Sequence, residues 1–181
     1  MKFSNLSYLA LSVALLAQPL MAQEQKPKPA GDAAPMMAVD RPTFVSVVSS
    51  ANEFEIKSSE LASQNASSGD LKQAAKMIIA DHQKAGEKLK GILDKKEAPL
   101  PSPIVLSPKH QKMLDQLQAA KGKDFDTLYL DMQVQAHLEA IALFRTYAGS
   151  GDDQTVVGFA KETLPSLETH LSHVKMFVAK Q

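Results

Sequence analysis

Four long stretches of this chain carry apolar residues at every third or fourth position, and that spacing constrains the fold more than any other feature. In the second stretch the apolar positions are Leu71, Ala75, Ile78, Ala85, Leu89 and Ile92. Residues spaced in this way lie on one face of an α-helix, whereas a half-buried strand alternates apolar and polar residues. No stretch of the chain shows that alternation. The sequence therefore predicts an all-α protein.

Capping and helix-breaking residues predict where the helices begin and end. Asp and Ser side chains accept hydrogen bonds from the free N–H groups of a first turn, and proline fits there because it has no N–H. We expect helices from Asp40 to about 65–69, from Ser67 and Ser68 to about Lys95, from Ser107 to about Ala120, from Asp124 to Ala148, and from Asp152 to Ala179. Pro165 lies inside the last of these helices and should bend it.

The connections between the helices differ in length, and this difference predicts the topology. The breaks near 65–69 and 149–152 are short, so each should join two antiparallel neighbours. Residues 97–108 contain four prolines and should be extended. This segment and the short helix after it can cross from one end of a bundle to the other. The prediction is a ferritin-like four-helix bundle with a long crossover connection that carries an extra short helix.

The N-terminus has the layout of a cleavable signal peptide over residues 1–22. Lys2 precedes an apolar core at about 8–16, and small residues lead to Ala22. The core is shorter than the roughly 20 residues that span a bilayer, so we expect export to the periplasm or the medium without stable membrane insertion after cleavage. An uncleaved anchor is the alternative. Residues 23–39 are rich in Pro, Ala and Lys and are interpreted as a flexible linker, which leaves 40–181 as the bundle domain.

Charge and composition exclude several classes of protein. Removal of residues 1–22 takes only Lys2 from 20 cations, which leaves 19 against 20 anions. The chain has no cluster of Lys and Arg interleaved with aromatic residues, so nucleic acid is not an expected partner. It has no cysteine, so neither disulfides nor lipid attachment at a cysteine is available. Nothing in the sequence predicts an oligomeric state or a protein partner.

Four ionisable residues interrupt the predicted inner faces of the long helices. They are Glu55, His82, His137 and His170. Glu55 and His82 lie about 13 and 14 residues from the first short turn, and His137 lies about 14 residues before the second. His170 lies about 19 residues after that second turn, which displaces it by about 7 Å along the helix. We therefore expect one carboxylate and three imidazoles to converge near the middle of the bundle.

Such a set suits a single transition-metal ion, because neutral imidazole binds Zn, Cu and Fe and a carboxylate supplies charge. Asp81 lies about 100° round the helix from His82, where it would orient another helix's imidazole or form a salt bridge between helices. We expect His110 to be exposed and His173 to be solvated. The leading hypothesis is a binding or stress-related protein with a mid-bundle metal.

Two alternatives remain open at this point. The same residues could form a hydrogen-bonded network that fixes the register of the helices in a structural or interaction module without any ion. A metalloenzyme would instead need an open coordination position at the metal. No residue of the sequence is assigned a catalytic role.

Motifs in all four long segments resemble a bacterial family of exported proteins known as domain of unknown function 4142. The matching residues are Glu55, Asp81–His82, Gln133–Val134–His137 and Leu164–Pro165–Leu167–His170–Leu171. The resemblance covers roughly 42–178 and implies a bundle related to ferritin-like proteins, without an established activity. A di-iron bundle needs Glu three residues before a His on two helices, whereas positions 79, 134 and 167 are Ile, Val and Leu. Ferroxidase chemistry is therefore not expected.

Overall fold

The computed structural model describes residues 39–96 and 98–180, and this part of the chain is helical without any strand. The helices are α1 (Arg41–Asn65), α2 (Gly69–Asp94), α3 (Pro108–Ala119), α4 (Gly122–Ser150) and α5 (Gln154–Val178). The all-α prediction is confirmed. The predicted signal peptide at 1–22 and the predicted linker up to residue 38 lie outside the described residues. None of the described helices is long and apolar enough to cross a membrane.

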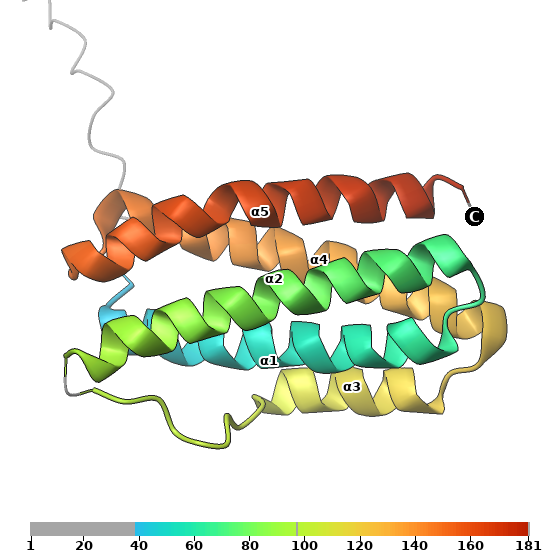
Figure 1. Ribbon diagram of the computed structural model, residues 1–181, viewed down its shortest axis with the longest axis horizontal. Helices are drawn as coiled ribbons and strands as arrows, with labels where there is room; N and C mark the ends of the chain where they lie inside the picture. Colours follow the sequence, from blue (N-terminus) through green and yellow to red (C-terminus); the bar gives the residue numbers. More distant parts are fainter. Residues whose placement is uncertain (1–38, 97, 181) are drawn as a thin grey trace, which may run out of the picture. The chain divides into compact units, whose positions relative to one another are not determined.

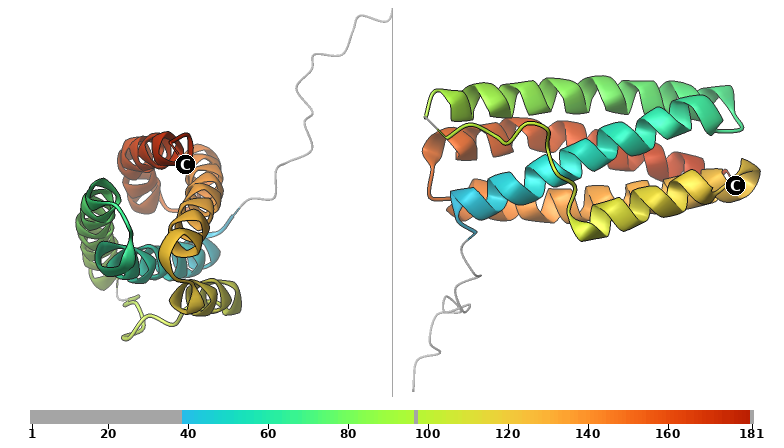
Figure 2. Two further views of the ribbon diagram at one scale, coloured as in Figure 1. Left: turned by 90° about the vertical axis from the view of Figure 1, so that its right-hand side faces the viewer. Right: turned by 90° about the horizontal axis from the view of Figure 1, so that it is seen from below.

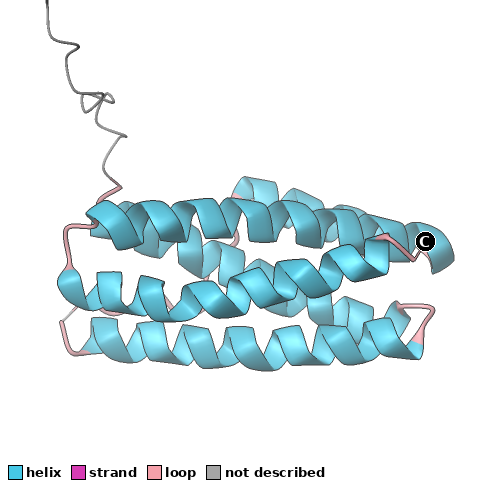
Figure 3. Cartoon of the chain, turned by 90° about the horizontal axis from the view of Figure 1, so that it is seen from above, coloured by secondary structure: helices cyan, strands magenta, loops and turns pink. Residues whose placement is uncertain are grey.

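The four long helices form a bundle in which α1 and α5 each pack against α2 and α4 (Figure 1). The pairs α1–α2 and α4–α5 are antiparallel hairpins, and the short turns that join them are visible in Figure 3. After α2 the chain crosses at one end, and α3 then runs back along α1 and α4 on the outside of the bundle (Figure 2). Helix α4 therefore begins at the opposite end. This is the predicted ferritin-like topology with a single crossover.

Three predicted caps are present in the structure. The side chain of Asp40 accepts from the Thr43 N–H at 2.9 Å, Ser68 from Leu71 at 3.1 Å, and Ser107 from His110 at 3.2 Å. Each of these oxygens pairs with an N–H group that has no partner within its own helix. The sequence therefore located three of the five helix starts by their caps.

The other two helix starts differ from the prediction. Helix α4 begins at Gly122 and has no side-chain cap, so Asp124 lies inside its first turn. Gly122 adopts a φ of 57°, a backbone conformation that glycine reaches without steric cost. The helix can therefore begin at Gly122, two residues before the predicted start at Asp124. Helix α5 is capped by Asp153 instead of Asp152, whose Oδ1 accepts a hydrogen bond from the Tyr147 hydroxyl at 2.9 Å.

Asp153 joins three parts of the fold, so its replacement should be costly. Its Oδ1 accepts from the Thr155 and Val156 N–H groups at the start of α5, and its Oδ2 lies 3.0 Å from Lys96 Nζ and 3.5 Å from a guanidinium nitrogen of Arg41 in α1. We expect Asp153→Ala to lower the free energy of unfolding by about 1–2 kcal/mol in urea titrations. Asp124→Ala, in a first turn without a cap, should change it by less than about 0.5 kcal/mol. Equal losses in the two variants would contradict the cap assignment.

A polar layer, formed by the buried side chains of Glu55, His82, Gln133, His137 and His170, lies between two apolar halves of the core. One half gathers at the α1–α2 turn and contains Phe54, Ala62, Ala66, Leu71, Ala75, Ile78, Met113, Leu114, Leu117, Phe125, Tyr129, Leu130, Met132 and Val174. The other gathers at the α4–α5 turn and contains Phe44, Val48, Leu89, Leu93, Ile141, Phe144, Tyr147, Val156, Val157, Phe159, Ala160 and Leu167. Helix α5 continues unbroken through Pro165, and the bend expected there stays a prediction.

Candidate metal centre

Three histidines from three different helices meet in the polar layer. His82 comes from α2, His137 from α4 and His170 from α5, and their ring centroids lie 5.4–5.8 Å apart. All three are buried, with exposed fractions of 8%, 1% and 2%. The offset of about 7 Å expected for His170 along its helix does not keep its ring out of the layer. The sequence prediction of convergence holds for the three imidazoles.

The spacing of the ring nitrogens is close to that of a metal site. One nitrogen of each histidine lies within 4.8 Å of one nitrogen of each of the other two. Three such atoms all lie within about 2.8 Å of a common point, and a metal–imidazole bond is about 2.0–2.1 Å long. Each ring would have to move inward by less than about 1 Å to bind a common ion.

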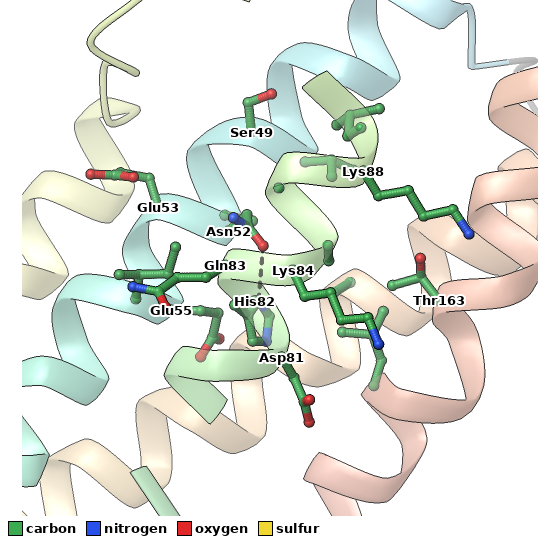
Figure 4. A pocket seen from close by; sticks show the side chains of 18 of the residues that line it. Ser49, Asn52, Glu53, Glu55, Asp81, His82, Gln83, Lys84, Lys88 and Thr163 are labelled. Atoms are coloured by element: carbon green, nitrogen blue, oxygen red, sulfur yellow. Dashed lines mark hydrogen bonds between the residues drawn. The ribbon is translucent and has the colours of Figure 1, made fainter. Parts of the chain in front are cut away.

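One nitrogen of each ring is held by a hydrogen-bond acceptor. His82 Nδ1 lies 3.0 Å from Asn52 Oδ1 (Figure 4), and His137 Nδ1 lies 2.9 Å from the Gln133 carbonyl oxygen. His170 Nε2 lies 2.9 Å from Asp81 Oδ2. Because all three partners accept hydrogen bonds, the nitrogen that faces each of them carries the proton. In a neutral ring the other nitrogen then has a free lone pair.

These free lone pairs have no partner among the described residues. His82 Nε2, His137 Nε2 and His170 Nδ1 are buried and make no hydrogen bond. A buried polar atom left in this state costs about 1–3 kcal/mol, and most such atoms in folded proteins are paired. Three unpaired acceptors on neighbouring rings from three helices are therefore unusual, and a cation that all three of them faced would pair with each.

The electrostatics of the layer keep the rings in the metal-binding form. Burial lowers the pKa of His82 well below 6.5, and the neighbouring His137 and His170 lower it further. Burial lowers the pKa of His137 to about 4. The pKa of His170 is also lowered by burial, and the hydrogen bond to Asp81 opposes that change. The three imidazoles are therefore neutral at pH 7, so a metal would not have to displace protons from them.

Glu55 lies beside the three histidines but not among their facing nitrogens. Its Oε1 is 3.7 Å from His137 Nδ1, on the side of the ring that already contacts Gln133. Burial raises the pKa of Glu55 to about 8, and a hydrogen bond with the Gln133 side chain works in the opposite direction. At pH 7 the carboxyl is mostly protonated and His137 is neutral, so this close contact is not an ion pair. Metal ligation by Glu55 stays a prediction.

Asp81 occupies the outer side of the layer. Its side chain is 47% exposed, and it reaches across from α2 to His170 on α5. In the view of Figure 4, Asp81 and Glu55 point to different sides of His82. Asp81 thus gives His170 an anionic hydrogen-bond partner, and its role toward an ion also stays a prediction.

A cavity of about 840 Å³ borders the layer, and its lining includes the three histidines, Asn52 and Gly86. Helices α1 and α2 approach closely here, because a Cβ at Gly86 would lie 2.9 Å from Asn52 Nδ2. The missing side chain at position 86 therefore leaves room for the amide that holds His82.

His110 was expected to be exposed, and this prediction was wrong. It is only 8% exposed, its Nδ1 lies 2.7 Å from Ser50 Oγ, and its ring stacks on Phe54. The first turn of α3 packs against α1, and the pattern of a short helix does not indicate which neighbour covers it. His173 is half-buried and lies outside the histidine group.

Asn52 and Gln133 are the two residues whose contacts with the histidines the sequence did not predict. Asn52 lies three residues before Glu55 on α1, so the sequence could have placed it on the same inner face. The sequence could not predict that Asn52 pairs with His82, because that contact joins two helices. The Gln133 contact uses a backbone carbonyl one helical turn before His137, which any residue at position 133 would supply.

Comparison with known proteins gives a fold and a family. A search of curated proteins finds no match. The chain is similar to the structure of CopM in its Cu(II)-bound form, with a TM-score of 0.68 and 19% identity over 80% of this chain and 99% of that one. The Ag-bound form of CopM gives a TM-score of 0.63 with 18% identity over 78% and 96%. At these identities the likeness shows the fold alone.

A DUF305 protein from Streptomyces coelicolor is similar as well, with a TM-score of 0.64 and 14% identity over 76% of this chain and 89% of that one. The model of one sequence family, described as a domain of unknown function, matches residues 26–177. This match covers most of the chain and confirms the resemblance seen in the motifs. The chain belongs to the DUF4142 family.

Proposed function

We propose that the protein is an exported metal-binding protein whose bundle holds a single transition-metal ion between His82, His137 and His170. The observation that carries this proposal is the convergence of three buried, unpaired imidazole nitrogens from three helices. The acceptor on the far side of each ring supports it, because ligating histidines usually donate their other N–H to such a group. Export rests on the signal-peptide pattern of residues 1–22.

The ligands suit Zn, Cu or Fe, and copper is the first ion to test. Neutral imidazole binds all of these metals. CopM, which shares the fold, has structures in Cu(I)-bound, Cu(II)-bound and Ag-bound forms. In this proposal Asp81 and Asn52 orient the imidazoles, and Glu55 lies beside His137 as a neighbour of the site.

A purely structural role for the polar layer is the second candidate, and some buried hydrogen bonds favour it. Ser59 Oγ lies 2.9 Å from the Tyr129 hydroxyl, and Gln133 Nε2 donates to Ser58 Oγ at 3.3 Å. These bonds join α1 to α4 and restrict how the two helices slide past each other. They do not pair the three facing imidazole nitrogens, which a self-sufficient network would have to do. Metal binding therefore accounts for more of the layer.

Metal titration of the purified, signal-free protein tests the proposal. We expect one copper ion per chain with a dissociation constant in the micromolar range or tighter, measured by calorimetry and elemental analysis. His82→Ala should abolish stoichiometric binding, because it removes one of the three ligands. His110→Ala is the matched control, since His110 is also 8% exposed but lies outside the group. A wild-type protein that takes up no Cu, Zn or Fe at micromolar concentration would refute the proposal.

A further inference from the structure

We propose that the three-histidine site selects a monovalent cation of the copper group, Cu(I), over divalent ions such as Zn(II) and Cu(II). This inference rests on the proposed function and adds the charge of the ion. It follows from three features of the layer: the charge of the ligands, the charge around them, and the number of ligands that the side chains supply.

The ligands carry no negative charge. Within the described residues, the group whose atoms lie within 4.8 Å of one another consists of imidazoles alone. Three neutral rings do not neutralise the charge of a bound ion, and the three histidines are only 1–8% exposed, so that charge would be buried. The cost of moving an ion out of water grows with the square of its charge, so a divalent ion pays about four times as much as a monovalent one.

The surroundings compensate for one positive charge. Asp81 holds its carboxylate oxygen 2.9 Å from His170 Nε2, one imidazole ring away from the facing nitrogens. Asn52 holds His82, and a backbone carbonyl holds His137, and both of these acceptors are neutral. Glu55 Oε1 lies 3.7 Å from His137 Nδ1, the nitrogen that already contacts the Gln133 carbonyl oxygen, and Glu55 does not belong to the group of ligand atoms that lie within 4.8 Å of one another. One anionic contact balances one positive charge.

The group of ligand atoms consists of three imidazole nitrogens and includes no fourth side chain. Any fourth ligand would have to be a water from the cavity of about 840 Å³ that borders the layer. Zn(II) in proteins is almost always bound by four ligands, and sites with three protein ligands add a water molecule. Cu(I) has a filled d shell and is stable with three ligands, so the three nitrogens are sufficient for it. Coordination number and charge therefore favour the same ion.

Competition titrations on the wild-type protein test the selectivity directly. Cu(I) is measured without oxygen against a coloured chelator, Zn(II) and Cu(II) against chelators of their own, and Ag(I) serves as a monovalent probe without redox chemistry. We expect Cu(I) and Ag(I) at one per chain, bound at least about 100-fold more tightly than Zn(II) and Cu(II). Excess Zn(II) should not displace them.

Two isosteric variants move the outer charge in opposite directions. Asn52→Asp adds a carboxylate behind His82 and should raise the affinity for Zn(II) relative to Ag(I) by about 10-fold or more. Asp81→Asn removes the carboxylate behind His170 and should lower the affinity for Zn(II) more than that for Ag(I). Glu55→Gln should leave Ag(I) affinity unchanged within about 3-fold, because Glu55 is outside the ligand set.

The outcomes separate this inference from the proposed function. Zn(II) or Cu(II) bound at one per chain as tightly as Cu(I) would overturn the inference and leave metal binding intact. A Glu55→Gln variant that lost a tightly bound divalent ion would also overturn it, since Glu55 would then be the missing ligand. Absence of any bound ion would defeat the proposed function itself. If Asn52→Asp fails to fold, the wild-type competition decides the question alone.

Discussion

His137→Ala is expected to remove the stabilisation that a bound ion gives to the fold. An ion that binds only the folded state at 1,000 times its dissociation constant adds about 4 kcal/mol to the free energy of unfolding. His137 supplies one of three ligands, so the variant should gain less than about 1 kcal/mol from the same ion concentration. Chemical denaturation with and without Cu(I), carried out without oxygen, measures the difference.

Ile141→Ala provides the control for this experiment, because Ile141 is buried one turn further along the same helix. Its truncation should cost about 2–5 kcal/mol of stability in the metal-free protein. The increment from the ion should nevertheless stay close to that of the wild type. Metal stabilisation that survives in His137→Ala would show that His137 is not a ligand.

Glu55→Gln is expected to change how the stability of the metal-free protein depends on pH. Burial raises the pKa of Glu55 from 4.5 to about 8, so between these values the unfolded chain loses a proton that the folded chain keeps. Stability from this group is fully present below pH 4.5 and is lost as the pH rises through 8. The glutamine does not titrate. Relative to the wild type, the variant should therefore gain roughly 2–5 kcal/mol between pH 5 and pH 8.

The histidines act in the opposite direction, so the pH range of the measurement matters. Burial lowers their pKa values below 6.5, and the metal-free fold loses stability as the pH falls from 6.5 toward about 4. This loss is common to the wild type and Glu55→Gln, and it cancels in their difference. Unfolding curves in a chelating buffer at pH 5, 6, 7 and 8 give that difference. Parallel pH profiles for the two proteins would contradict a buried, protonated Glu55.

The helices and their order could be predicted because the signals that specify them are local. A 3–4 residue period indicates a helix with one buried face, and Asp40, Ser68 and Ser107 cap theirs by bonding to N–H groups three residues away. The start of α4 was misplaced because Gly122 can enter a helix with a positive φ, and no side-chain cap marks that entry. Side-chain capping signals cannot locate a helix start such as this one, where the backbone conformation of a glycine makes the turn into the helix.

The approximate height of each histidine could also be predicted, because an α-helix rises by a constant 1.5 Å per residue from each turn. Such counting brought His82 and His137 to the same level. It also included Glu55, whose Oε1 lies 3.7 Å from His137 Nδ1 but which is not in the group of ligand atoms that the three histidines form. Height along a bundle does not determine the direction in which a side chain points, since that depends on the rotation of the helix and on the rotamer.

The helices, the crossover topology and the ionisable residues halfway along the buried faces could thus be read from the residues alone. The packing of the helices was needed to show that the three imidazoles lie together, that Asn52 and a backbone carbonyl contact two of them, that the imidazole held by Asp81 is His170, and that His110 packs against α1. Each of these contacts joins separate helices or depends on a rotamer. The geometry of these contacts depends on how side chains from two helices pack together, so it cannot be predicted from the residue pattern of either helix alone.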